Sequence, residues 1–186
     1  MKNKYIYTVC LAGLITLGSC KKLTEDLNVN PNQPTDAPSD LVLNGTEVGS
    51  ILVYEGNLAR IAGIFSNSFT GTDRQYVEYE NYNSSAPDYD DTWDNLYSGV
   101  IAQAKIGEAK ATAVNNKLQM GIFQVIQAQA FGTAADLWGD VPFSEVSQPD
   151  KFPNPAFEPQ AQVYAGVQTL LDNAIANLSA NVGQNP

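Results

Sequence analysis

Residues 117–143, with the sequence KLQMGIFQVIQAQAFGTAADLWGDVPF, combine an apolar helical pattern with an abrupt stop. Apolar and small side chains recur there at the three- and four-residue spacing of a helix. Ile122, Val125, Ile126 and Gln129 mark one stripe, and Phe123, Ala130 and Ala134 lie beside it. A pattern with so wide a face predicts a buried helix of roughly five turns.

The end of this helix is also visible in the sequence. Gly139 follows Leu137 and Trp138 at the place of a left-handed helix cap, and Pro142 cannot continue a helix. We therefore expect a tight exit that carries Trp138 and Phe143. Burial tendencies favour a packed role for such aromatic residues, so the stretch describes architecture and by itself gives no function.

Two further stretches precede the central helix. In residues 41–69, apolar positions that include Val48, Ile51 and Leu52 recur at helical spacing, which predicts one long helix or two with a break near Gly56. Residues 92–113 predict another helix, with Trp93 and Tyr97 one turn apart on its buried side. A short turn at residues 115–116 then leads into the central helix, so the two predict an antiparallel helical hairpin.

The cleanest amphipathic pattern lies near the end of the chain. Residues 139–159 carry five of the ten prolines and predict an extended, ordered surface connection. Residues 160–179 then place apolar side chains on one helical face. No convincing strand pattern is present. The sequence therefore predicts an all-α fold of four or five amphipathic helices paired as hairpins and joined by long ordered loops.

The first 20 residues predict export. Lys2 and Lys4 precede an apolar run from about residue 5 to residue 17, which is too short to span a membrane and is typical of a signal peptide. Leu17-Gly18-Ser19-Cys20 resembles the lipobox of bacterial lipoproteins, which implies that residues 1–19 are removed and that Cys20 is acylated, palmitate being one such chain. An ordinary signal peptide with a coincidental cysteine is the alternative. Residues 20–40, rich in Pro and Asn, predict a tether.

The composition excludes several classes of function. The chain has 10 basic and 20 acidic residues, so its formal charge of −10 argues against nucleic-acid binding. It has no histidine, which excludes histidine-based catalysis and histidine-ligated metals within this chain. A calcium loop starting at Asp88 is also excluded, because an EF-hand needs Glu at the twelfth position, where this chain has Gly99. We expect neither a metal nor a cofactor.

Residues 70–92 form the most distinctive predicted loop, in which four tyrosines lie among amide, carboxylate and guanidinium side chains. Planar rings cover the C–H faces of sugars while the polar groups bind hydroxyls, so this composition suits sugar recognition, and it suits peptides equally. The alternative is a surface loop whose tyrosines pack onto the helices with their hydroxyls in water.

Residues 136–145, DLWGDVPFSE, followed by residues 157–164, FEPQAQVY, and an amphipathic helix, resemble the hallmark of the SusD/RagB family of outer-membrane nutrient-binding lipoproteins. The resemblance implies a fold of tetratricopeptide-like helix pairs. Because members are several times longer, it also implies that residues 41–186 are the N-terminal part of the domain, with the C-terminal remainder absent.

The same resemblance implies a non-catalytic protein that is anchored by lipid to the bacterial outer membrane. Glu25 and Asp26, shortly after Cys20, resemble the signal that sends some lipoproteins to the outer face of that membrane, so we expect the protein to face the cell exterior. Such a protein would form a lid on a SusC-like TonB-dependent transporter and capture oligosaccharides, or in some branches peptides. The implied ligand contacts are Asp73, Arg74, Gln75, Tyr76, Tyr79 and Tyr82.

Two other classes compete with this interpretation. A glycosidase needs two carboxylates about 5 to 10 Å apart, and Glu78 and Glu80 are the obvious pair. A structural or adhesive lipoprotein would instead use tetratricopeptide-like surfaces for protein contacts. Hydrolysis of a bound glycan would favour the enzyme. Association with a barrel transporter without measurable ligand affinity would favour the structural protein.

Overall fold

The computed structural model describes residues 36–180. The predicted signal peptide, Cys20 and most of the predicted tether lie outside these residues. The described part is mostly helical, which confirms the all-α prediction, and its only strands are two residues long. No helix in it is long and apolar enough to cross a membrane.

The first helical stretch bends where the sequence predicts a break. Helix α3 (Ser39–Leu52) passes into a π-helical segment, η2 (Val53–Leu58), and then into α4 (Ala59–Phe65). Gly56 has a non-helical backbone within this π segment, with φ −91° and ψ −119°. A π segment of this kind is a common cause of a kink. α3 begins directly after Pro38, slightly earlier than the sequence predicts.

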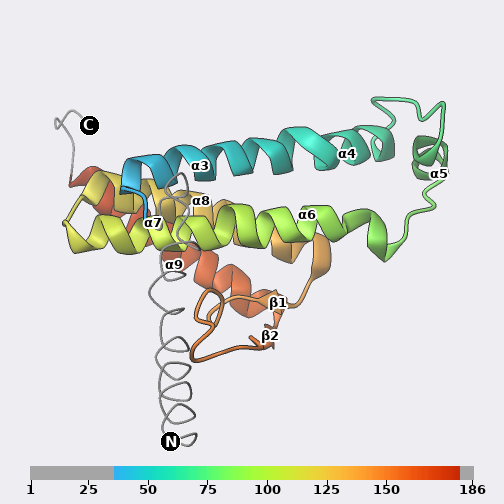
Figure 1. Ribbon diagram of the computed structural model, residues 1–186. Helices are drawn as coiled ribbons and strands as arrows, with labels where there is room; N and C mark the ends of the chain where they lie inside the picture. Colours follow the sequence, from blue (N-terminus) through green and yellow to red (C-terminus); the bar gives the residue numbers. More distant parts are fainter. Residues whose placement is uncertain (1–35, 181–186) are drawn as a thin grey trace, which may run out of the picture. The chain divides into compact units, whose positions relative to one another are not determined.

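A second helical stretch runs beside the first. It consists of a short 3₁₀ turn, η3 (Ala86–Tyr89), then α6 (Asp90–Asp94), the π-helical η4 (Asn95–Ile101) and α7 (Ala102–Ala113). Figure 1 shows it lying along α3 and α4. Between the two stretches, the predicted loop contains a helix of its own, α5 (Gln75–Glu80), because its tyrosines pack back onto α4.

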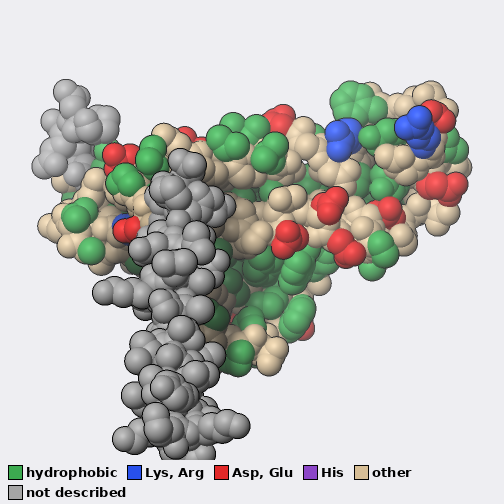
Figure 2. Space-filling view, viewed as in Figure 1, with side chains coloured by type: hydrophobic (Ala, Val, Ile, Leu, Met, Phe, Trp, Pro, Cys, Tyr) green, Lys and Arg blue, Asp and Glu red, His purple; other side chains and the backbone are tan. Residues whose placement is uncertain are grey.

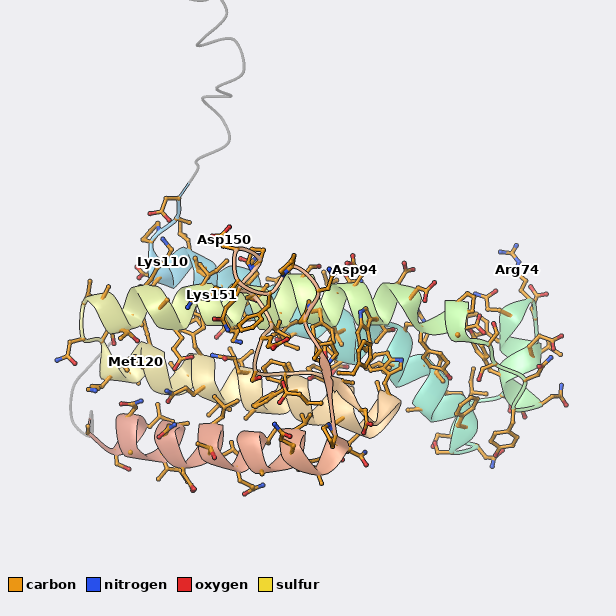
Figure 3. All side chains as sticks on the ribbon, turned by 90° about the horizontal axis from the view of Figure 1, so that it is seen from below. Arg74, Asp94, Lys110, Met120, Asp150 and Lys151 are labelled. Carbon is orange, nitrogen blue, oxygen red and sulfur yellow. The ribbon has the colours of Figure 1, made fainter. Side chains whose placement is uncertain are left out.

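The predicted central helix is α8 (Lys117–Trp138), and it forms a hairpin with α7 as expected. Asn116 caps α8 by accepting a hydrogen bond from the Gln119 backbone N–H at 3.2 Å. Gly139 ends it with a φ of +76°, a conformation that glycine adopts without strain. α9 (Gln160–Ser179) packs along α8, and Figure 3 shows α7, α8 and α9 side by side.

The connection between α8 and α9 is ordered, as predicted, and it includes a short antiparallel pair. β1 (Val141–Pro142) pairs with β2 (Phe157–Glu158), with Val141 opposite Glu158. The Glu158 carboxylate then accepts a hydrogen bond from the Ser144 backbone N–H. This pairing holds the exit from α8 against the start of α9.

The main core lies where η4, α8, α9 and β1 meet. Phe131 is fully enclosed there, with its ring edge-on to Phe143 at 4.7 Å and to Tyr97 at 6.5 Å. Burying a side chain of this size contributes roughly 1.5–3 kcal/mol. A second, smaller core joins α4 to α5 and is built on Ile61, Ile64 and Tyr79.

One prediction about the central helix is wrong in part. The face that carries Phe123 and Ala130 is buried, but the stripe of Ile122, Val125, Ile126 and Gln129 lines an open groove of about 590 Å³. We call this hollow the aliphatic groove; its other lining residues are Glu47, Ser50, Ile51 and Leu178.

The same correction applies to the first helix, where Val48, Ile51 and Leu52 are all exposed. α3 instead turns Val42 and Thr46 toward the core. Gly49, which lies between Thr46 and Val53 on the same helical stretch, approaches η4 closely. A Cβ atom at Gly49 would lie 2.8 Å from the carbonyl oxygen of Gly99. Helix α3 therefore packs through its small residues, and its large aliphatic residues stay outside.

Candidate functional site

A polar hollow lies where α6, the end of α8, η3 and the two serines before η3 meet. It has a volume of about 590 Å³. We call it the aromatic cleft, and its lining residues are Ser84, Ser85, Ala86, Tyr89, Asp90, Trp93, Leu137 and Trp138. Three aromatic rings, three hydroxyls and one carboxylate thus face one space.

Trp93 and Trp138 come from different helices and meet edge-to-face, with ring centroids 5.0 Å apart and an interplanar angle of 88°. Trp93 is supported from behind by Tyr97, whose ring lies 4.5 Å away, and by the nearly parallel ring of Phe157 at 6.2 Å. Tyr97 is fixed in turn, because its hydroxyl donates to the Pro142 carbonyl oxygen at 2.9 Å. The tryptophan pair is therefore a rigid wall.

The part of the cleft rim at Ser85 is held by Asp88. Its Oδ2 accepts hydrogen bonds from the backbone N–H and the hydroxyl of Ser85 at 2.6 and 2.8 Å, and its Oδ1 accepts one from the Tyr79 hydroxyl at 3.1 Å. The backbone bond and the side-chain bond from Ser85 favour the charged carboxylate and lower the pKa of Asp88. Tyr89 adds a bond from its hydroxyl to Ser84 at 3.3 Å.

None of the six residues predicted as ligand contacts lines this cleft. Asp73 and Tyr76 line a smaller pocket of about 210 Å³, together with Arg60 and Phe69. Arg74 is exposed and pairs with Asp73 at 3.7 Å. Gln75 and Tyr79 border a polar pocket of about 350 Å³, which shares Ser84 and Ser85 with the aromatic cleft.

Two of the predicted tyrosines have clear packing roles. Tyr79 is only 5% exposed and joins the small core beneath α5, where burial raises the pKa of its hydroxyl. Tyr82 is 63% exposed, yet its ring leans on Phe65 at 5.4 Å and its hydroxyl donates to the Phe65 carbonyl oxygen at 3.1 Å. For these two rings the structure agrees with the packing part of the alternative, whereas their hydroxyls bond to Asp88 and to the Phe65 carbonyl oxygen and not only to water.

The sequence interpretation assigned Trp93 and Trp138 to the core and so missed their place in the cleft. Both are only partly buried and are packed against the edge of the main core. One signal was available: Trp138 is the last residue of a helix, directly before Gly139, and a side chain at a helix end has neighbours on fewer sides. That signal does not show which residues lie opposite.

The described residues offer no metal site, since no group of three or more acidic, Cys or His side chains could hold an ion there. Glu78 and Glu80, the candidate pair for a glycosidase, are committed to other bonds. Glu78 accepts from Asn83 at 2.6 Å, and Glu80 accepts from the Gly71 backbone N–H at 2.8 Å. The arrangement of the cleft suits the binding of a polar ligand with apolar faces.

Comparison with known proteins agrees with this architecture. Residues 31–185 match the SusD-like family model described as "Starch-binding associating with outer membrane". No curated protein matches the sequence. A solved SusD/RagB family protein from Bacteroides thetaiotaomicron VPI-5482 superposes with a TM-score of 0.64 at 22% identity, over 76% of this chain.

That match covers 30% of the solved protein, so the aligned part of this chain spans less than a third of that protein's length. At 22% identity, the likeness establishes a shared fold. The family model covers the last ten residues of the predicted tether, both helical stretches, the central hairpin and α9. The chain belongs to the SusD/RagB family.

Proposed function

We propose that this chain is the N-terminal part of a cell-surface lipoprotein that binds nutrient oligosaccharides and passes them to a SusC-like TonB-dependent transporter. The observation that carries the proposal is the aromatic cleft, with Trp93, Trp138 and Tyr89 around one open space. The description of the matched family as starch-binding and associated with the outer membrane supports the same ligand class and location.

The walls of the cleft fit an oligosaccharide chemically. A sugar ring has an apolar C–H face, which an aromatic ring covers, and an equatorial edge of hydroxyls. Ser84, Ser85, Tyr89 and Asp90 supply donors and acceptors for those hydroxyls. A volume of about 590 Å³ is within the range of small-molecule sites and accommodates a short stretch of glycan.

The predicted loop residues enter the proposal as secondary contacts. Asp73 and Tyr76 in the smaller pocket, and Gln75 beside the polar pocket, extend the binding surface from the cleft toward α5, and Arg74 lies at its outer edge. Tyr79 supports this surface from beneath. Tyr82 packs on Phe65 and lines none of these three pockets, so we assign it no part in ligand binding. A longer oligosaccharide would then contact both regions.

Membrane attachment is proposed through Cys20, with residues 1–19 removed as a signal peptide. The tether is then residues 20–38, shorter than the sequence predicts, because α3 begins at Ser39. Mass spectrometry of the mature protein tests this directly. We expect an N-terminal Cys20 carrying acyl chains, and a Cys20→Ser variant that is released from the membrane fraction. An unmodified mature terminus would contradict the anchor and leave the cleft unaffected.

An oligopeptide is the second candidate ligand, favoured by the carboxylate of Asp90 beside aromatic rings, which also suits a basic peptide. We propose that no bond is broken in either ligand. A structural, adhesive lipoprotein is the third candidate, and it predicts no saturable binding of small ligands at the cleft.

Calorimetry of the full chain with a set of oligosaccharides and peptides tests the proposal. Trp138→Ala and Tyr89→Ala should weaken glycan binding at least about tenfold, since each removes a stacking surface. Phe152→Ala, at an exposed ring that does not line the cleft, is the matched control and should bind normally. Tyr76→Ala reports on the smaller pocket.

Thermal unfolding of each variant separates lost binding from lost folding. Equal binding by the wild type and both folded cleft variants would overturn the assignment of the site. Peptide binding without glycan binding would replace the ligand class. New reducing ends after incubation with a glycan would contradict a purely binding role.

A further inference from the structure

We infer that the aromatic cleft selects glycans by charge, accepting neutral and amino-bearing oligosaccharides and rejecting those that carry uronate or sulfate groups. The inference rests on the proposed function and names the ligand class of the same site. It is carried by the distribution of charged side chains around the cleft.

The segments that build the cleft carry several acidic residues and no basic one. Asp90 lines it, Asp91 and Asp94 lie within one turn of Asp90, and Asp88 holds the rim at Ser85. Residues 75–104 contain six carboxylates and no Lys or Arg, and residues 118–150 contain no Lys or Arg either. Figure 2 shows acidic side chains along α6 and the adjoining loop, with the basic ones at this end over α4 and α5.

None of the cations of residues 36–180 lines the cleft. Arg60 lines the smaller pocket, and Arg74 pairs with Asp73. Lys105 is partly buried and donates to the Val146 carbonyl oxygen at 2.8 Å. The remaining three lie farther away.

Figure 3 shows Arg74 at one end of the molecule and Lys110 and Lys151 toward the other, with Asp94 between. Lys117 starts α8, and Trp138 ends it 21 residues later, which is about 31 Å of helix. An anion in the cleft would therefore find carboxylates nearby and no cation on the cleft wall to neutralise it.

The consequence follows from elementary electrostatics. The Debye length at about 0.1 M salt is about 10 Å, so a uronate in the cleft would feel the repulsion of Asp90 and its neighbours. It would also lose water without gaining a donor of opposite charge. A protonated amine in the same place would form a charge-assisted hydrogen bond with Asp90.

Three matched probes test the inference on the full chain: maltohexaose, its C6-oxidised uronate form and its 6-amino-6-deoxy form. Maltohexaose is chosen because the matched family is described as starch-binding. At about 0.1 M salt we expect the uronate form to bind at least about tenfold more weakly than the neutral form, and the amino form about threefold more tightly. At about 1 M salt, where the Debye length is about 3 Å, both differences should shrink.

Asp90→Asn should make the affinities for the neutral, uronate and amino forms more similar to one another. Asp150→Asn removes the same charge from a loop that does not line the cleft and should leave their ratios unchanged. Equal binding of the neutral and uronate forms, or a ratio that salt and Asp90→Asn do not alter, would overturn the charge selection while leaving glycan capture intact. If none of the three probes binds, the proposed function fails first, and this inference fails with it.

Discussion

The aromatic cleft and the aliphatic groove have the same volume, about 590 Å³ each, and walls of different chemistry. The cleft gathers three aromatic rings with hydroxyls and a carboxylate at the ends of helices. The groove lies against the sides of α3, α8 and α9, and five of its eight lining residues are aliphatic, with no ring among them. Size alone therefore says little about a ligand, and the side chains of the wall decide which hollow suits a sugar.

The largest effect should come from Phe131, because α8 contributes a wall to both hollows. We expect Phe131→Ala to destabilise the chain by about 3–5 kcal/mol, since the ring is fully enclosed and leaves a cavity. Urea unfolding measures the change. Val125→Ala on the same helix is the control, and it should cost under about 1 kcal/mol because Val125 is 39% exposed in the groove. Similar costs for the two would mean that α8 does not have one enclosed face and one open face.

The positions of the helices could be predicted from the sequence, because the spacing of apolar residues along a helix is a local pattern. The break near Gly56, the hairpin of α7 and α8, and the stop at Gly139 were all expected and confirmed. Which apolar stripe faces inward could not be predicted, because both sides of α8 carry large aliphatic or aromatic residues. The choice depends on close approaches between helices, such as that of Gly49 to Gly99, which no periodicity reveals.

The site was harder to predict, for a related reason. The tyrosine-rich loop was recognised as distinctive, yet Tyr79 is used to support the rim of the cleft. The wall of the cleft joins Trp93 to Trp138, which are 45 residues apart and meet only after the hairpin has formed. Composition drew attention to residues 70–92, of which Ser84, Ser85 and Tyr89 line the cleft, whereas only tertiary packing adds the two tryptophans to it.

The second prediction changes α3, which lines the aliphatic groove and not the aromatic cleft. Gly49→Ala would place a methyl group 2.8 Å from the Gly99 carbonyl oxygen, so α3 must move, at a cost of about 1–3 kcal/mol. Gly45→Ala is the matched control: it has open space around it and should stabilise the chain by about 0.5–1 kcal/mol through helix propensity.

Both tryptophans of the chain line the cleft, so tryptophan fluorescence of the folded protein reports on that hollow. We expect the emission spectrum of folded Gly49→Ala to match that of the wild type, because the displaced helix borders the groove. A shifted spectrum would show that the two hollows are mechanically coupled.

A third, smaller effect concerns the rim of the cleft. Tyr79→Phe keeps the buried ring and removes only the hydrogen bond to Asp88, so we expect a loss of about 1 kcal/mol in the free energy of unfolding. Glycan affinity should fall a few-fold as the rim loosens, whereas Tyr82→Phe, at an exposed residue, should leave affinity unchanged. Identical affinities for the two variants would remove Tyr79 from the support of the site.

The pH dependence of the unfolding temperature should report on Asp88, which holds the same rim. The pKa of Asp88 is lowered in the folded chain, so its contribution to stability is present above the unfolded pKa of about 3.9 and is lost as the pH falls through the folded value. We expect the unfolding temperature to drop more steeply below about pH 4 in the wild type than in Asp88→Asn. Parallel curves for the two proteins would show that the bonds from Ser85 do not favour the charged carboxylate.

The smallest effect is expected in the groove itself, and a pair of identical substitutions isolates it. Ile51 on α3 is 58% exposed and Ile61 on α4 is 4% exposed, so the same change to serine removes the same atoms from opposite environments. Because serine and isoleucine have similar helix propensities, the difference reports on burial. Ile51→Ser should change the free energy of unfolding by no more than about 0.5 kcal/mol, and Ile61→Ser should cost about 3 kcal/mol or more. Equal losses in the free energy of unfolding for the two variants would mean that Ile51 is as buried as Ile61 in solution. The aliphatic groove would then be part of the core and not an open hollow comparable with the aromatic cleft.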